Sequence, residues 1–481
     1  MIAKIKTFIR DKISDKAMLS IGIALLCVYY FVGLLSYIAV PIKPISRVFA
    51  SSSPLAIILR AFMCGLIVLY SAVVVIKYKP KIKWTWLIIF GFTLFMTFIC
   101  ILLSPRSYDY SYVSQLYNVV HVIRLECSNG RTAVMFLSSI ADFVFAFCIM
   151  FILPFVINDK KKLLILLLPI VAIGLLECGY SAIFEKDSYI YMFNHPDDPF
   201  GGYNNSVGAT FGNKEDWGSF LIVAISSSVA SFYFVKDFRK KTLIRIGLAI
   251  SIFIMSIFVL FSLCKTAILA LALIMLTLFV GYTVMSFYKS FRKGMIFAGI
   301  LFVAIIFIIS FLSTNGFGVP ILGKIANYFN KLIIDRSESA IAGRSALWLN
   351  YMENVRGYNL FFGMGKNYVN NYTYALAKEG QSSIHNGLVY FFASYGLIGF
   401  IVFVSLLFVA LSNIIKTWTI DKQQVFLFLA LFFGAFSFVL AEAEVLIISS
   451  STPIFIFNVL VVMLPGALLE KRNKERLEMS L

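Results

Sequence analysis

Charged residues are scarce in this sequence, and their scarcity argues against an ordinary water-soluble protein. Only 14% of the 481 residues are charged, whereas 60% are hydrophobic. A soluble chain of this length needs a polar surface, so the balance indicates that lipid is its main solvent. The charges that are present are mostly basic, with 42 Lys and Arg against 24 Asp and Glu. Because they stand in short clusters between apolar runs, they suit loops facing anionic lipid, and we expect no nucleic-acid partner.

Cysteine and histidine are also sparse. None of the seven cysteines belongs to a Cys-x-x-Cys pair, and most lie inside apolar stretches. The sequence therefore offers neither a disulfide framework nor a zinc site. The chain has three histidines, His121, His195 and His385, so few side chains are available for acid–base chemistry near neutral pH.

Long apolar runs dominate what is present. A helix needs roughly 20 apolar residues to cross about 30 Å of hydrocarbon, and twelve stretches reach or approach that length. They cover residues 17–40, 54–76, 84–103, 132–157, 162–184, 216–235, 242–262, 265–286, 294–313, 385–413, 423–441 and 452–470. The runs are continuous rather than alternating, which favours helices. The sequence predicts an all-α integral membrane protein of about 12 transmembrane helices, with residues 1–481 forming a single polytopic membrane domain.

Lys and Arg occupy every second connection between these spans. They gather in the N-terminal tail, in the connections around residues 77–83, 160–162, 236–241, 289–293 and 416–422, and in the C-terminal tail. Positive loops face the cytoplasm, so both termini are predicted to be cytoplasmic. The same count places three longer loops outside, at residues 104–131, 185–215 and 314–384.

The outer loop at residues 314–384 is the largest soluble piece. Long loops in compact proteins are usually functional or disordered, and we expect this one to carry part of an active site. Apolar residues recur at helical spacing across residues 344–355, including Trp348 and Tyr351, and Gly357 follows. This pattern predicts an amphipathic helix near the outer membrane surface that ends at Gly357.

His385 stands at the outer mouth of the tenth span, after Ser382 and Ser383. Either serine is expected to cap that helix. A helix N-terminus disfavours a cation, so it would tend to keep His385 neutral and able to accept a proton. A second polar feature lies within the spans, where Arg60, Asp142 and Glu177 occupy the outer half of the membrane. We expect Arg60 to pair with one of the two acids.

Several short motifs together resemble the O-antigen ligase and O-antigen polymerase family. The first is His385-Asn386 followed by Gly396 and Gly399, glycines that by themselves suggest close helix packing. Gly343-Arg344, Trp348 and Gly363-Met364-Gly365 resemble the rest of that family's large outer loop. Two further elements are similar: Phe211-Gly212-Asn213-Lys214 with Gly218, and Cys264-Lys265-Thr266-Ala267, in which Lys265 stands where the family usually has Arg. The motif resemblance covers roughly residues 205–412.

The resemblance implies glycosyl transfer on the outer face of a bacterial cytoplasmic (inner) membrane. The donor would be an oligosaccharide on undecaprenyl diphosphate, and the reaction would need no cofactor, metal or nucleotide sugar. Consistent with this, the predicted outer loops contain no Asp-x-Asp pair; Asp197-Asp198 is typical of a solvated turn beside Pro199. The other partners implied are membrane lipid, a flippase and a chain-length regulator of the same pathway.

The expected roles follow from the chemistry of such a transfer. A base must take a proton from the acceptor hydroxyl, and His385 is the candidate. Cations must hold the diphosphate as it leaves. The candidates for binding diphosphate or substrate are Arg344, Lys214, Lys265, Trp348 and Asn386, and the expected structural glycines are Gly396, Gly399, Gly363 and Gly365.

Three functions remain open from sequence. The first is a polymerase that joins lipid-linked repeat units into O-antigen, capsular or exopolysaccharide. The second is an O-antigen ligase that transfers finished glycan to a lipid A core. The third, from another class, is a polysaccharide or small-solute transporter. A transporter should show half-chain repeats and charges deep in the bundle, and neither is evident.

Overall fold

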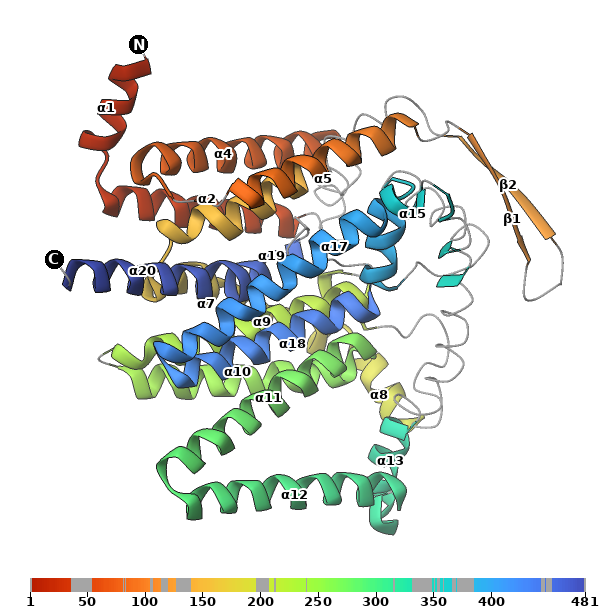
Figure 1. Cartoon of the computed structure of the whole chain (residues 1–481). Helices are drawn as coiled ribbons and strands as arrows, with labels where there is room; N and C mark the ends of the chain where they lie inside the picture. The colour runs from red at the N-terminus through yellow and green to blue at the C-terminus, as the bar shows by residue number, and fades with distance from the viewer. Residues whose placement is uncertain are drawn as a thin grey trace.

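A computed structural model gives the architecture of the chain. The structure describes residues 2–35, 54–80, 82, 84–103, 107–113, 120–126, 140–195, 207–211, 213–238, 240–314, 316–330, 348–349, 351–352, 355–357, 359–365, 369, 385–442, 446 and 452–479. These residues form a bundle of long apolar helices (Figure 1). The predicted all-α, multi-pass membrane fold is confirmed.

Within the described residues, ten helices are long and apolar enough to cross a membrane. They are α2 (Asp15–Leu35), α4 (Pro54–Tyr78), α7 (Lys160–Phe184), α9 (Lys214–Phe234), α10 (Lys241–Phe261), α11 (Lys265–Lys289), α12 (Phe291–Ser313), α17 (Gly387–Lys416), α18 (Lys422–Ala441) and the run formed by α19 (Thr452–Phe457), η9 (Asn458–Met463) and α20 (Leu464–Met479). Two shorter apolar helices occupy the other two expected positions. One lies in α5 (Trp84–Leu103), and the other runs from Ile140 through η1 (Cys148–Ile152) to the end of η2 (Leu153–Phe155). Each expected span thus overlaps a helix, although a count of twelve membrane crossings stays a prediction.

Both termini lie at one end of the bundle, and α17 starts at the other (Figure 1). Contacts tie the basic clusters together at the terminal end. Lys77 Nζ lies 3.3 Å from Asp15 Oδ1, Lys160 Nζ donates to Gln424 Oε1 at 2.7 Å, and Lys236 Nζ lies 3.3 Å from Asp421 Oδ2. The connections that were expected on one side of the membrane therefore do share one side; that this side is the cytoplasm stays a prediction.

Helix α9 forms the centre of the bundle. It packs against α7, α10, α11 and α18, and nearly all of its side chains from Trp217 to Ser231 are buried. Its buried serines would be costly in an apolar core, but Ser227 and Ser228 donate to the carbonyls of Val223 and Ala224 one turn earlier. Helix α12 stands apart and presents almost its whole surface outward (Figure 1).

The outer loop at residues 104–131 contains a β-hairpin that the sequence analysis did not predict. Strands β1 (Ser107–Val113) and β2 (Val120–Glu126) pair antiparallel, from Ser107 opposite Glu126 to Val113 opposite Val120. The hairpin projects beyond the outer end of the bundle (Figure 1). β1 alternates tyrosines with polar residues, and β2 alternates apolar with polar residues except at the adjacent Val122 and Ile123. Such a short strand pattern is easily overlooked between long helical spans.

The other outer connections carry short helices. They are α8 (Lys186–Asn194), η4 (Ala209–Phe211), η6 (Gly316–Gly318), α13 (Pro320–Phe329) and α15 (Asn359–Phe362). Within the expected helix at 344–355, residues 348–349 and 351–352 are helical, and most of the others lie outside the described residues. Gly357 has a φ of +60°, as expected of a residue that ends a helix. The remaining short elements, α1 (Ile2–Lys12), η5 (Val235–Asp237) and η8 (Thr417–Thr419), lie at the terminal end.

Candidate active site

The candidate site forms where three membrane helices begin and a fourth ends. Helices α9, α11 and α17 start at the outer end of the bundle, and α18 ends there at Ala441. The residues just before or after these ends are Asn213, Cys264, Asn386 and Glu442. Four segments that are far apart in sequence therefore supply side chains to one place.

His385 and Glu442 form a hydrogen-bonded pair at the centre of the site. His385 Nδ1 lies 2.8 Å from Glu442 Oε2, and the two side chains are only 10% and 15% exposed. A carboxylate accepts, so the neutral imidazole is assigned its proton on Nδ1 and a lone pair on Nε2. No other described residue hydrogen-bonds His385, so Nε2 can accept a proton from a bound substrate.

Glu442 is in turn held by the start of α11. Thr266 Oγ1 donates to Glu442 Oε1 at 2.7 Å. Both carboxylate oxygens are therefore engaged, one by Thr266 and one by His385. This chain of hydrogen bonds fixes the imidazole orientation, as an acidic residue does for the histidine of a hydrolytic triad.

Glu215 brings a second carboxylate to the pair. One donor atom from each of Glu215, His385 and Glu442 lies within 4.8 Å of the other two. Such a set could hold a metal ion, and it could equally work as an acid–base group without one. The expectation that the reaction needs no metal stays a prediction.

Backbone strain gathers around the site. Five described residues other than glycine have a positive φ, and three of them lie in the segments that lead into helices of the site. Leu263 (φ +58°) and His385 (φ +40°) stand two residues before α11 and α17, and Ala209 (φ +48°) opens η4, which precedes α9. Side chains disfavour this region of backbone geometry, so the surrounding structure must hold them there. The strain turns the chain sharply into the helix start and aims the next residues at the centre.

Asn386, not a serine, caps α17. Its Oδ1 accepts from the N–H groups of Leu388 at 3.0 Å and Val389 at 3.1 Å. The cap expected at Ser382 or Ser383 is wrong, because α17 begins at Gly387. The side-chain oxygen of Asn386 is thus committed to the helix start, and the expected binding of substrate by Asn386 stays a prediction.

Two of the expected cations directly precede residues that contact or approach the His385–Glu442 pair. Lys214 directly precedes Glu215, and Lys265 directly precedes Thr266. The Lys265 ammonium is almost fully shielded from solvent. Arg344 lies outside the described residues. Trp348 packs half-buried against the cluster formed by Tyr351, Val355, Met364, Val369 and Ala393, so it helps dock the outer loop on the first turns of α17.

Gly218 permits the close approach of α9 and α11. A Cβ at this position would lie 2.7 Å from Cys264 Cβ and 3.1 Å from Ala267 Cβ, closer than real side chains pack. Burial raises the pKa of the Cys264 thiol to about 12, with nearby Glu442 and Glu215 adding to the shift and Lys214 opposing it. The thiol is therefore protonated at neutral pH and does not serve as a nucleophile.

Gly363 and Gly396 join the outer loop to a break in α17. Gly396 has φ +66° and ψ −169°, a conformation open essentially to glycine alone. The break frees the carbonyls of Ala393 and Ser394, which accept from Met364 N at 2.8 Å and Gly365 N at 3.1 Å. A Cβ on Gly363 would meet the Ser394 backbone at 2.5 Å. The motif glycines therefore dock the loop on α17 about two turns after its start.

Gly396 and Gly399 were first expected to allow close packing between neighbouring helices. The structure instead gives them roles within α17 and at its contact with the outer loop. Gly396 interrupts α17 and meets the loop backbone at Gly363 and Phe361. Gly399 sits one turn further on, where a Cβ would lie 2.4 Å from Tyr395 Cβ in the same helix. Gly399 therefore leaves room for the side chain of Tyr395, which the break in α17 displaces.

Two glutamates, Glu177 and Glu185, hold the segment that precedes α9. Glu177 of α7 accepts from Thr210 N at 3.2 Å and Thr210 Oγ1 at 2.8 Å. Glu185 Oε1 accepts from Gly208 N and Ala209 N, each at 3.0 Å. The two acids thus hold the strained turn that leads into α9. The expected partner Arg60 has a side chain outside the described part, so its pairing stays a prediction.

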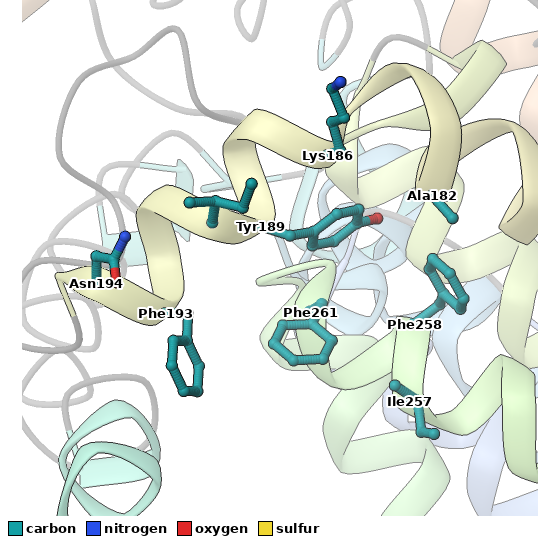
Figure 2. A pocket seen from close by; sticks show the side chains of 9 residues that line it. Ala182, Lys186, Tyr189, Phe193, Asn194, Ile257, Phe258 and Phe261 are labelled. Carbon is teal, nitrogen blue, oxygen red and sulfur yellow. The ribbon is translucent and has the colours of Figure 1, made fainter. Parts of the chain in front are cut away.

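An apolar pocket opens beside the site between α8 and the last turn of α10 (Figure 2). Its volume is about 460 Å³, and rings of Tyr189, Phe193, Phe258 and Phe261 line it. Figure 2 shows these rings gathered between the two helices, with Lys186 pointing away from them. Phe261 lies four residues before Lys265, and Phe258 contacts the buried ring of Trp217 with centroids 6.0 Å apart. The pocket therefore adjoins the helix starts that carry the cations.

Two acidic residues of the site escaped the sequence analysis. Glu442 follows the eleventh span directly, and Glu215 opens the sixth. Their position could have identified them as candidate site residues, because an acidic residue at the outer end of a span lies at the same depth as His385.

Comparisons with known proteins agree with this arrangement. A search of curated proteins gives no match. Residues 250–404 match the family model described as O-Antigen ligase. The match runs from α10 through the outer loop into α17, and so includes Lys265, Arg344, His385 and Gly396. The resemblance to the O-antigen polymerase and ligase family is thereby confirmed, and residues 250–404 of this multi-pass membrane protein are similar to the O-antigen ligase family.

Proposed function

We propose that this protein is a membrane glycosyltransferase that polymerises undecaprenyl-diphosphate-linked repeat units on the outer face of the bacterial cytoplasmic membrane. The observation that carries the proposal is the His385–Glu442 pair, set at the end of the bundle opposite the basic loops and next to the docked outer loop. The family match supports a glycan-transferring enzyme of this general type. The products would be O-antigen, capsular or exopolysaccharide, and a flippase and chain-length regulator would be pathway partners.

The proposed reaction is a single displacement. His385 Nε2 takes the proton of an acceptor hydroxyl while the oxygen forms a bond to the anomeric carbon of the donor sugar. The bond from that carbon to the diphosphate breaks, and undecaprenyl diphosphate leaves with the bonding electrons. Lys265, Lys214 and Arg344 are proposed to stabilise the leaving diphosphate. One displacement inverts the anomeric configuration, so a product that retains the donor's configuration would contradict this mechanism.

The carrier's prenyl chain fits the apolar pocket between α8 and α10. A pocket of about 460 Å³ is large enough for part of a flexible hydrocarbon chain. Filling it with Ile257→Trp is expected to raise the KM for the lipid-linked donor about tenfold, because chain contacts are lost while the reacting groups stay in place. Ile250→Trp, two turns away on the same helix and outside the pocket, is the control. An unchanged KM in Ile257→Trp would place the chain elsewhere.

We also propose that the transfer needs no metal. Wild-type activity should survive extraction with a chelator, since His385 and Glu442 already complete an acid–base pair. The measurement is turnover before and after EDTA, followed by readdition of Mg²⁺, Mn²⁺ or Zn²⁺. Activity that disappears with EDTA and returns with one ion would instead assign Glu215, His385 and Glu442 as its ligands.

A ligase is the second candidate, because the matching family model is itself described as O-Antigen ligase. A gene-deletion strain complemented with wild type or His385→Ala separates the candidates. Loss of the long glycan ladder with single repeat units remaining supports the polymerase. Long glycan that stays on its carrier indicates the ligase. Normal glycans from His385→Ala at matched protein levels would overturn the catalytic role and reopen a transport function.

A further inference from the structure

A second cavity lies at the opposite end of the bundle from His385, among the basic connections. Its volume is about 520 Å³, and it sits between α5, η2, α17 and α20. This is the end that holds both termini (Figure 1). Nothing in the proposed transfer reaction uses it, since the donor and acceptor meet at the other end.

The cavity has an apolar wall and a basic rim. The wall is formed by Trp86, Phe151 and Phe155, and Trp86 lies against Phe151 with ring centroids 5.5 Å apart. The polar side carries three cationic residues, Lys416 at the end of α17 and Arg472 and Arg476 on α20, against one acid, Glu470. A surface that joins aromatic rings to an excess of positive charge is complementary to an amphiphile with an anionic head.

The three cations also have no acidic partner in the described part of the chain. Among the residues that the structure describes, no carboxylate lies within 4.0 Å of the charged nitrogens of Lys416, Arg472 or Arg476. Two other basic residues at this end do have acidic partners, since Lys77 is paired with Asp15 and Lys236 with Asp421. Amide side chains of Asn413 and Asn473 add hydrogen-bond donors to the same rim. Guanidinium and amide groups together suit a phosphate, which accepts several hydrogen bonds at once.

We propose that this cavity binds the phosphate head group of an anionic phospholipid, with an acyl chain against Trp86 and Phe151. On the predicted topology the lipid comes from the inner leaflet, where anionic head groups are available to basic pockets between membrane helices. The site would anchor α20 and the start of α5 to the membrane surface, independently of catalysis.

The test measures lipid retained on the full-length protein after purification and exchange into mixed micelles. Native mass spectrometry with added phosphatidylglycerol or phosphatidylcholine should show wild type retaining the anionic lipid preferentially. The double variant R472Q/R476Q is expected to weaken retention about thirtyfold, because each basic residue contributes about 1 kcal/mol to holding an anionic lipid.

The matched control is K289Q/K471Q, which removes two positive charges from the same end without touching the cavity. It should retain phosphatidylglycerol as wild type does, and equal thermal stability of both variants in detergent shows that each is folded. Equal retention of the two lipids by wild type would overturn the proposal. Displacement of bound lipid by millimolar inorganic phosphate alone would also overturn it, because the site would then recognise a free anion.

Discussion

Replacement of His385 by Ala is expected to reduce the transfer rate about a thousandfold, because a positioned general base typically contributes between about a hundredfold and ten-thousandfold. The imidazole is the only described histidine at the site, and its Nδ1 is already occupied by Glu442. Binding of the donor should change little, since the cations and the apolar pocket remain. The loss should therefore appear in kcat rather than in KM.

Variants of the residues that orient His385 should give a graded series. Glu442→Gln keeps the size of the side chain, but an amide can donate as well as accept, so it no longer enforces the tautomer with the proton on Nδ1 and carries no charge to stabilise the imidazolium. We expect about a hundredfold loss. Thr266→Val removes only the 2.7 Å hydrogen bond to Glu442, and we expect about a tenfold loss. Steady-state turnover at matched protein levels measures the loss in these two variants and in His385→Ala. A Glu442→Gln enzyme as active as wild type would show that the pair is structural.

Gly396→Ala is expected to detach the outer loop and abolish most activity in a folded protein. A side chain in this backbone conformation costs about 1–3 kcal/mol. The added Cβ would also lie 2.4 Å from Gly363 N and 2.5 Å from the Phe361 carbonyl. The loop can move away more easily than α17 can, so the carbonyls of Ala393 and Ser394 lose their partners from the loop.

Limited proteolysis from the outer side measures this detachment, and the loop of the Gly396→Ala variant should be cut faster than that of wild type. Gly247→Ala is the control, because Gly247 lies within α10 and a Cβ there meets nothing within 4 Å. Alanine favours a helix over glycine, so Gly247→Ala should leave the stability of the protein unchanged or raise it. Wild-type protection and activity in Gly396→Ala would contradict the docking role assigned to the break.

The membrane helices were the most predictable part of the molecule. A long apolar run in hydrocarbon must hydrogen-bond its own backbone groups, and a helix that is long enough to cross the membrane does so. The predicted 242–262 and 423–441 spans differ from α10 and α18 by one residue at most at either end. The hairpin of β1 and β2 lies outside hydrocarbon, where this constraint disappears, and it was missed.

The site was only partly predictable, because its partners are brought together by packing. His385 could be singled out from its rarity and its place at a helix mouth, but Glu442 lies 57 residues further along the chain. Nothing in a single sequence shows that α17 and α18 place these two side chains 2.8 Å apart. Gly396 was predicted to allow close helix packing rather than to break α17, because two glycines in a sequence do not show that one of them has a positive φ.

The most direct test of the central claim uses purified protein and a single synthetic substrate, one repeat unit on undecaprenyl diphosphate. Mass spectrometry of the products should show two joined repeat units on one carrier and one equivalent of free undecaprenyl diphosphate. The His385→Ala protein should form neither product. Wild-type protein that joins no sugars, but moves the intact substrate across a vesicle membrane, would contradict the account and identify the protein as a transporter.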